Sequence, residues 1–307
     1  SAVATLGFHI LPASARGAND RIQIGAIGVN GKGQVDTMAV SAAGAEIVAL
    51  CDVANPRNPE LTRKKKAKAG DTMPDRFPGA KLFTDYREMI ATMSGIDAVT
   101  VSTPDHHHFH AAMLAMRKGK HVYCQKPLTH TVREARTVTD AARRAKVQTQ
   151  MGNQGHSSES IRLLKEWLAA GVIGDVREVH AWTDRPVGGD PWSNFAVQAQ
   201  PKDTPPVPAT LDWDLWCGPA PLIPYSPQVG HKNWRQEKTT GQGHLYDWGL
   251  HLIDAARMIL GEKSPKTVSA AGGLFQLTGK ITTPDTLTAQ FEFERCHQLY
   301  ETARTSL

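Results

Sequence analysis

Short apolar runs alternate with helical patterns through the first half of the chain. The runs that predict buried β-strands lie at residues 21–28, 45–52, 96–103, 121–124 and 147–152. Segments between them have the periodicity of helices, for example residues 108–119 and 132–145. Strands that alternate with helices are joined by right-handed crossovers and therefore run parallel. The pattern predicts an α/β domain with a doubly wound parallel sheet of the Rossmann type over residues 21–150.

The second half of the chain has a different pattern. The elements that it predicts are helices at residues 160–174 and 245–260 and strands at residues 176–183, 266–273 and 286–294. Residues 184–238 are rich in Pro, Gly and Trp and show little periodicity. We therefore expect residues 151–307 to form an α+β domain with a mostly antiparallel open sheet. No alternating strand pattern follows Phe293, so either this sheet is abbreviated at its C-terminal end or the chain is a fragment.

Composition excludes several classes of protein. The chain has 307 residues, 40% of them hydrophobic and 21% charged, which is enough to bury a large core. A net charge of +5 and the basic run at residues 63–68 raise the question of nucleic acid, but the run has no interleaved aromatic residues and is typical of a solvated helix face. No segment approaches the ~20 apolar residues of a membrane span. The four scattered cysteines predict neither a disulfide framework nor a cysteine-bound metal; they are Cys51, Cys124, Cys217 and Cys296.

Residues 1–20 form a separate segment before the first predicted domain. Residues 1–15 are apolar and rich in small side chains, end in Ala13-Ser14-Ala15 and precede a polar stretch. This is typical of the back half of an export signal and predicts a periplasmic or otherwise exported protein. The alternative is an N-terminal arm, flexible or packed on a neighbour, on a cytoplasmic protein.

A glycine-rich turn follows the first predicted strand. The residues of this turn that we expect to contact the cofactor are Gly28, Asn30, Gly31 and Gly33. Such a turn between a strand and a helix lets the backbone approach a pyrophosphate at the helix N-terminus. Asp52 ends the second strand nineteen residues after Gly33, where a carboxylate can bind the adenosine ribose hydroxyls and would repel a 2′-phosphate. The pattern favours NAD as cofactor, and the nearby Arg57 keeps NADP possible.

Further motifs occur in a fixed order along the chain. They are Thr103-Pro104 with a histidine run, Gly119-Lys120-His121, Gln125-Lys126-Pro127, and Asp247 with Gly249 and His251. With the glycine-rich turn, they resemble the Gfo/Idh/MocA oxidoreductases, named for glucose-fructose oxidoreductase and inositol dehydrogenase. The resemblance extends from about residue 21 to at least residue 293. It implies a Rossmann domain, a second domain with an open sheet, and a substrate bound between them over the nicotinamide. It also implies a homo-oligomer formed through the second sheet, which the short C-terminal end would weaken.

The resemblance also assigns roles to these motifs. Lys126 matches the family's active-site lysine, and Asp247 and His251 match its aspartate and histidine. Thr103 and Pro104 match the turn beside the nicotinamide ribose. Gln125, also expected near the cofactor, replaces the family's usual glutamate, which removes a negative charge and keeps hydrogen bonding.

The residues themselves explain why a lysine suits this position. Lys126 follows a predicted strand of the parallel sheet, at the edge where such sheets bind ligands, and Pro127 disfavours helix there. An ammonium group at this place can hydrogen-bond a substrate hydroxyl and stabilise an alkoxide. Asp247 and His251 are four apart on a predicted helix, so both lie on one face. The histidine can then accept a hydroxyl proton while the carboxylate orients it or holds the substrate.

Other polar and aromatic residues are candidate ligand contacts. In the histidine run at residues 105–110 we expect His108 to contact the cofactor and His106 the substrate, with no metal, because consecutive histidines point in different directions. The loop after the last strand of the first domain offers amides at Asn153 and Gln154 for a polyhydroxylated ligand. The remaining candidates, for stacking and anchoring a sugar, are Arg185, Trp192, Trp234 and Arg235.

These observations favour an NAD(P)-dependent oxidoreductase that moves a hydride between the cofactor and a hydroxyl carbon of a sugar or polyol. Lys126 and His251 would handle the proton. Two alternatives stay open: a glycosidase that uses tightly bound NAD for transient oxidation, and an inactive, truncated nucleotide-binding protein. We expect no nucleic-acid partner and no membrane span.

Overall fold

A computed structural model provides the structure of the protein. It describes residues 21–57, 70–183, 204–227, 229, 233–279 and 281–294, and the backbone of residues 297–302. Some of the predictions concern residues outside the described ones, namely residues 1–20, residues 63–68, Arg185, Trp192 and Cys296. Among the described helices, none is long and apolar enough to cross a membrane.

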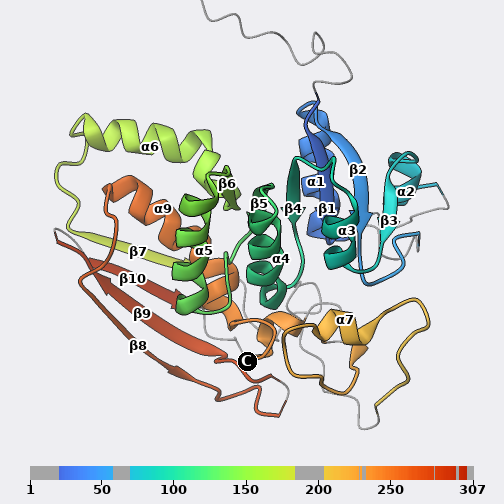
Figure 1. Cartoon of the computed structure of the whole chain (residues 1–307). Coiled ribbons are helices and arrows are strands. Elements are labelled where there is room, and N and C mark those ends of the chain that lie inside the picture. Colours follow the sequence, from blue (N-terminus) through green and yellow to red (C-terminus); the bar gives the residue numbers. More distant parts are fainter. Residues whose placement is uncertain are drawn as a thin grey trace, which may run out of the picture.

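The first domain is built on a six-stranded parallel sheet (Figure 1). Its strands are β1 (Gln23–Ile27), β2 (Glu46–Cys51), β3 (Lys81–Phe83), β4 (Ala98–Val101), β5 (His121–Gln125) and β6 (Thr149–Gly152). Their order in space is β3-β2-β1-β4-β5-β6, and every pairing is parallel. This confirms the doubly wound sheet. The order reverses between β1 and β4, and ligands bind outside the carboxyl ends of the strands at such a point.

Helices cover both faces of this sheet. They are α1 (Lys32–Ala42), α2 (Met73–Arg76), α3 (Tyr86–Thr92), α4 (Asp105–Arg117) and α5 (Val132–Ala145). One buried cluster joins α3, α4 and α5 to the strands and includes Ile27, and a second joins Val40 of α1 and Met73 of α2 to Ala26 on the opposite face. Neighbouring residues of a strand point to opposite faces, so β1 is buried on both sides. This burial fixes the carboxyl edge of the sheet as a rigid platform.

The second domain contains a four-stranded sheet. Its strands are β7 (Glu178–Thr183), β8 (Thr267–Gly273), β9 (Thr286–Glu292) and β10 (His297–Thr302), in the order β7-β10-β9-β8. β10 is parallel to β7 and the other pairings are antiparallel, as expected for a mostly antiparallel sheet. The expectation of no strand after Phe293 was wrong. β10 lies in the interior of the sheet, where hydrogen bonds to neighbours on both sides outweigh its weak sequence pattern.

One helix packs on this sheet, and a second helix packs on the first (Figure 1). They are α9 (Leu250–Leu260), which contacts β7 and β10, and α6 (Glu159–Ala169), which packs on α9. A π-helical turn, η6 (Leu245–Gly249), leads into α9, and a 3₁₀ turn, η4 (Gln154–Ser157), precedes α6. The predicted helix at residues 245–260 is therefore present, with a wider first turn that carries Asp247.

The described part of the irregular region returns to the first domain. Asp212 N donates to Val53 O at 2.9 Å, and Asn55 N donates to Thr210 O at 2.8 Å. The segment then forms α7 (Trp213–Cys217) and, further on, the 3₁₀ turn η5 (Asn233–Gln236). The rings of Trp213 and Trp216 stack with centroids 4.4 Å apart in a buried cluster. Residues 210–212 thus pair with residues 53–55, directly after β2.

Candidate active site

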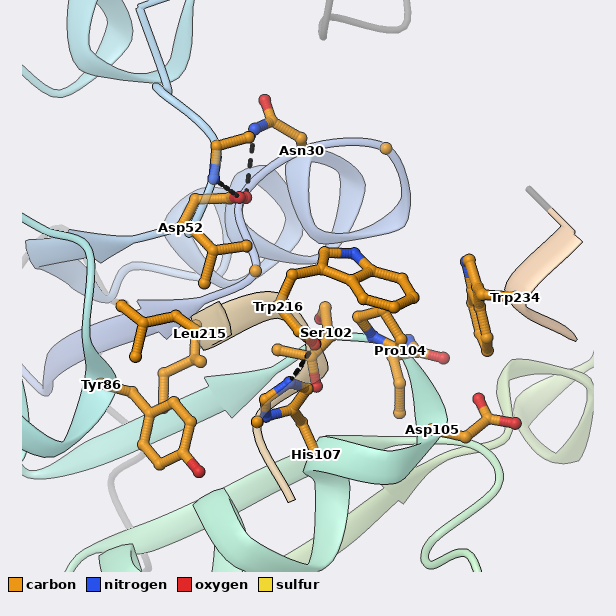
Figure 2. A pocket seen from close by; sticks show the side chains of 18 of the residues that line it. Asn30, Asp52, Tyr86, Ser102, Pro104, Asp105, His107, Leu215, Trp216 and Trp234 are labelled. Carbon is orange, nitrogen blue, oxygen red and sulfur yellow. Dashed lines mark hydrogen bonds between the residues drawn. The ribbon is translucent and has the colours of Figure 1, made fainter. Parts of the chain in front are cut away.

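A cavity of about 1240 Å³ lies between the carboxyl edge of the first sheet and the second half of the chain. Figure 2 shows Asn30, Asp52 and Ser102 of the first domain around the same space as Leu215, Trp216 and Trp234. Of the predicted site residues, those that line it are Gly28, Asn30, Gly31, Asp52, Thr103, Pro104, Gln125, Lys126, Gln154, Trp234, Arg235, Asp247 and His251. The structure therefore gathers most of them around one space.

The glycine-rich turn forms one end of the cavity. Gly28 has φ +75°, and a Cβ there would lie 2.8 Å from the carbonyl group of Ser102. A Cβ on Gly33 would lie 1.6 Å from Gly28 O. Gly31 has φ +55° and precedes α1, whose N-terminus no side chain caps. The turn is thus as tight as close approach of a phosphate group requires, and the backbone N–H groups of the α1 N-terminus face such a group.

Asp52 holds this turn in place from the end of β2. Its carboxylate accepts hydrogen bonds from Val29 N at 2.9 Å, Asn30 Nδ2 at 3.1 Å and Ala54 N at 3.0 Å (Figure 2). Burial raises the pKa of Asp52, while these hydrogen bonds lower it in part. The carboxylate also lines the cavity. It is therefore placed to accept hydrogen bonds from a ribose and to repel a phosphate at the same position.

Gln125 belongs to a buried network that sequence reasoning missed. Asp36 of α1 is 5% exposed, and its Oδ2 accepts hydrogen bonds from Gln125 Nε2 and Ser102 Oγ, each at 2.8 Å. Lys32 pairs with its other oxygen. A glutamate at position 125 would bring a second carboxylate against Asp36 at a buried site. The glutamine therefore fits this chain because α1 already supplies the negative charge.

His108 lies behind the cavity and not in it. Its side chain is 1% exposed, and its ring nitrogens lie 2.5 Å from Pro127 O and 2.9 Å from Thr103 O. Burial lowers the pKa of His108, so it is neutral and donates to one of these carbonyl groups at a time. It joins the turn after β4 to the turn that carries Lys126. The expected contact with the cofactor is not supported by this position.

His106 and His107 join α4 to α7. Their Nε2 atoms lie 2.9 and 2.8 Å from the same acceptor, Trp216 O, and His106 Nδ1 lies 3.3 Å from Thr240 O. Burial lowers the pKa of His106 to about 3 and that of His107 to about 4, so both are neutral near pH 7. His106 is not in the cavity lining, and its predicted contact with substrate is not supported. The sequence could not show that α7 would cover this face of α4.

Lys126, Asp247 and Arg235 form a charged group on the cavity wall. Lys126 Nζ donates to Asp247 Oδ1 at 2.6 Å and also to the backbone carbonyl of Asp247. Arg235 Nε lies 3.4 Å from the same Oδ1, and its guanidinium lies 4.1 Å above the Trp234 ring. Burial alone would raise the pKa of Asp247, but Arg235 and Lys126 hold it below its usual value. Asp247 is therefore an anion between two cations.

His251 lies one helical turn after Asp247 and is half-buried. Its ring packs beside Trp248, with centroids 5.7 Å apart. Burial, and then the charge of Lys126, lower the pKa of His251. The imidazole is therefore neutral near pH 7 and can accept a proton. An amine, a carboxylate and a neutral imidazole thus line one cavity, which is a suitable set for removing a proton from a hydroxyl group.

The loop after β6 contributes one of its two predicted residues. Gln154 lines the cavity, and its Nε2 donates to Tyr123 OH at 3.3 Å. Asn153 is 7% exposed and does not line the cavity, and its amide atoms have no hydrogen-bond partner among the described residues. Arg185 lies outside the described residues. In the described part of the chain, no group of three or more His, Cys, Asp or Glu side chains is arranged to bind a metal.

The lining fits a dinucleotide. The tight turn leaves room at Gly31, where a Cβ would meet nothing within 4 Å, and Thr103 Oγ1 is a buried hydroxyl that has no partner among the described residues. Asp52 stands where an adenosine ribose is expected in this fold. One cavity of about 1240 Å³ is lined both by this turn and by Lys126 and His251, which suits a molecule with a phosphate-bearing middle and a reactive end.

Two family models match the chain. Residues 22–153 match the model described as "Oxidoreductase family, NAD-binding Rossmann fold", and residues 222–304 match the "GFO/IDH/MocA C-terminal domain". Together they cover most of the chain and both parts of the cavity wall.

Curated relatives are similar at low identity. D-glucoside 3-dehydrogenase of Escherichia coli is 24% identical over 225 residues, which cover 73% of this chain and 49% of that protein. Inositol 2-dehydrogenase 1 of Saccharopolyspora erythraea is 32% identical over 161 residues, 52% of this chain and 44% of that protein. The chain spans about half the length of these relatives.

Solved structures share the fold. GenD2 from gentamicin A biosynthesis, in complex with NAD, has a TM-score of 0.67 at 19% identity and covers 100% of this chain and 70% of that chain. Aldose-aldose oxidoreductase from Caulobacter crescentus has a TM-score of 0.65 at 19% identity, with 93% and 72% covered. The two family models show that the chain belongs to the Gfo/Idh/MocA family of oxidoreductases and carries its NAD-binding Rossmann domain.

Proposed function

We propose that the protein is an NAD-dependent dehydrogenase that transfers a hydride between the cofactor and a hydroxyl carbon of a sugar or polyol. The observation that carries this proposal is the meeting of Lys126 from the first domain with Asp247 and His251 from the second in the cavity that the glycine-rich turn closes. Relatives named as glucoside and inositol dehydrogenases support it.

Residues of the first domain would hold the cofactor. The 28–33 turn and the α1 N-terminus suit the pyrophosphate, Asp52 the adenosine ribose, and Thr103 with Pro104 the other ribose. When bound, NAD supplies the nicotinamide that accepts the hydride. Gln125, which donates a hydrogen bond to Asp36, directly precedes Lys126.

Residues of the second domain would complete the proton path. His251 accepts the proton of the substrate hydroxyl. Lys126 has three N–H groups, two of which Asp247 occupies, so one is left to donate to the substrate oxygen and stabilise its developing negative charge. Asp247 holds the ammonium in place and keeps its charge compensated. The Trp234 ring, backed by Arg235, offers an apolar face to a sugar ring.

A turnover assay tests this proposal. Purified protein is mixed with NAD and a panel of sugars and polyols, and the near-ultraviolet absorbance of reduced nicotinamide is followed. We expect reduction with at least one polyol. Bound NAD with no reduction by any member of the panel would overturn the proposal. Release of an aglycone from glycosides without net NAD reduction would indicate redox-neutral glycosidase chemistry instead.

The pH dependence of oxidation is the first prediction. The lowered pKa of His251 keeps the imidazole neutral and basic to a lower pH than a histidine with the ordinary pKa of ~6.5. As pH falls, kcat/KM is expected to hold until the pH is below that value and then decline as the ring is protonated. The measurement is kcat/KM from about pH 5 to 9, with His251→Asn expected to lose this acid limb together with most of the activity. An acid limb centred above the ordinary histidine value would contradict the assignment of His251 as the base.

Cofactor preference is the second prediction. In Asp52→Ser the carboxylate that would bind the ribose and repel a 2′-phosphate is gone, so the Kd for NAD is expected to rise about 10- to 100-fold, the effect of one or two charge-assisted hydrogen bonds. The NAD-to-NADP affinity ratio should fall. Calorimetric titration with each nucleotide measures both. Asp140→Ser, which changes an exposed carboxylate on α5, is the control and should alter neither value. An unchanged ratio in Asp52→Ser would show that Asp52 does not face the ribose.

A further inference from the structure

Asp105 is a carboxyl group on the cavity wall that the proposed chemistry does not use. It is the first residue of α4, directly after Pro104, and only 5% of it is exposed. It lines the cavity, and Figure 2 shows its side chain beside Pro104, on the side of the Trp234 ring. The small exposed part of Asp105 therefore faces the space that a ligand would fill.

Asp105 has no direct polar partner in the part of the chain that the structure describes. Among the described residues, no donor hydrogen-bonds it, and no Lys, Arg or His nitrogen lies within ion-pair distance of it. Arg235, Lys126 and Asp247 act on it only at longer range. A buried polar group without a partner costs free energy. A group that is left unpaired at a cavity wall is explained if a ligand supplies the partner.

Its surroundings suit a hydroxyl partner. Burial raises the pKa of Asp105 to about 8, although Arg235 and Lys126 oppose the rise, so the carboxyl group can be present as an acid near neutral pH. A carboxylic acid both donates and accepts a hydrogen bond, which matches an alcohol group in either direction. The positive charges of Lys126 and Arg235 act on both Asp247 and Asp105, which places the two carboxyl groups around the same part of the cavity.

We propose that Asp105 binds a second substrate hydroxyl, next to the one handled by Lys126 and His251, so that the site selects substrates with two neighbouring hydroxyl groups. This inference rests on the proposed function and deepens it. Trp234 and the two carboxyl groups line the same cavity, and an apolar ring face beside polar groups suits a sugar ring with alternating C–H and O–H groups. A secondary alcohol with a single hydroxyl would leave Asp105 unpaired.

The test compares a polyol substrate with its analogue that lacks the neighbouring hydroxyl. In the unmodified protein, removing that hydroxyl is expected to lower kcat/KM about 10- to 100-fold, as for loss of a hydrogen bond to a buried polar group. In Asp105→Leu the two compounds should react at similar rates, because the group that tells them apart is absent. Asp105→Asn keeps hydrogen bonding, so it should retain most of the discrimination. The Kd for NAD should not change in either variant, and Asp140→Asn is the control.

The outcomes separate this inference from the proposed function. If the unmodified protein oxidises no polyol, the proposed function fails. The role of Asp105 is then tested by calorimetry, which compares the affinities of the NAD-loaded protein for the polyol and for the analogue that lacks the neighbouring hydroxyl. If the unmodified protein is active and Asp105→Leu distinguishes the two compounds as strongly as the unmodified protein does, the proposed function stands and only the role of Asp105 is overturned. Thermal melting checks folding: removal of an unpaired carboxyl group should leave the melting temperature of Asp105→Asn equal or higher at pH 9, where the acid would be charged. If Asp105→Leu does not fold, the comparison is made with Asp105→Ala.

Discussion

Lys126→Met is expected to lower kcat about 10³-fold or more with every substrate that the protein oxidises, while the Kd for NAD changes less than about threefold. Methionine has a similar length but cannot donate a hydrogen bond or carry a charge. The substrate oxygen then develops negative charge without its ammonium partner. Because Arg235 still contacts Asp247, that carboxylate keeps one cation, and the fold should persist. Steady-state kinetics and nucleotide titration measure the two quantities.

Two further variants make this result specific. Lys165→Met removes an exposed lysine from α6 and should leave kcat unchanged. Lys126→Arg keeps the positive charge but not the compact ammonium, and should restore little activity, because the guanidinium cannot take the place of Nζ against Asp247. If Lys126→Met retained nearly full kcat, the cavity between the domains would not be where the hydroxyl is oxidised. If NAD affinity collapsed with kcat, Lys126 would belong to the cofactor site instead.

Local signals predicted the part of the site that lies on the first domain. A strand that is followed by glycines and then a helix predicts a tight turn at the carboxyl end of that strand. Asp52 lies beside this turn because β1 and β2 are adjacent in the sheet. Lys126 follows β5 at the carboxyl edge of the sheet, one strand from the point between β1 and β4 where the order reverses, so its place near the cofactor follows from the topology. Asp247 and His251 could be paired from their spacing on a helix, but only the family resemblance, and not their spacing, indicated that this helix would face Lys126.

Long-range packing explains what could not be predicted. His106 and His108 lie two residues apart on α4 and were candidate ligands, yet carbonyl groups of α7 and of the Lys126–Pro127 turn contact their ring nitrogens. Nothing in the sequence of α1 indicated that Asp36 would be buried and paired, because its partner Gln125 lies on β5. β10 was missed for the same reason, since its strand state depends on β7 and β9. In each case the partner lies far away in the sequence, and no local pattern records it.

Gly33→Ala is expected to weaken NAD binding at least about 100-fold and to lower the free energy of unfolding by roughly 1–3 kcal/mol. A methyl group there would lie 1.6 Å from Gly28 O. The backbone of Gly28 is itself packed closely against the backbone of Ser102, so it has little room to move away. The strain cannot be relieved by a side-chain rotation, so either α1 must move away from the sheet or the turn must open. Both changes displace the backbone that would hold the pyrophosphate. Calorimetric titration with NAD and chemical denaturation measure the two effects.

Gly79→Ala is the matched control, because a Cβ at this exposed turn meets nothing within 4 Å and no positive φ is required there. It should leave NAD affinity unchanged and keep stability the same or slightly higher, since alanine restricts the unfolded chain. The decisive comparison is between NAD affinity and stability in Gly33→Ala. A variant that is folded at full stability and binds NAD normally would mean that the turn between β1 and α1 is looser than the contact between Gly33 and Gly28 requires, and that the cofactor is held elsewhere.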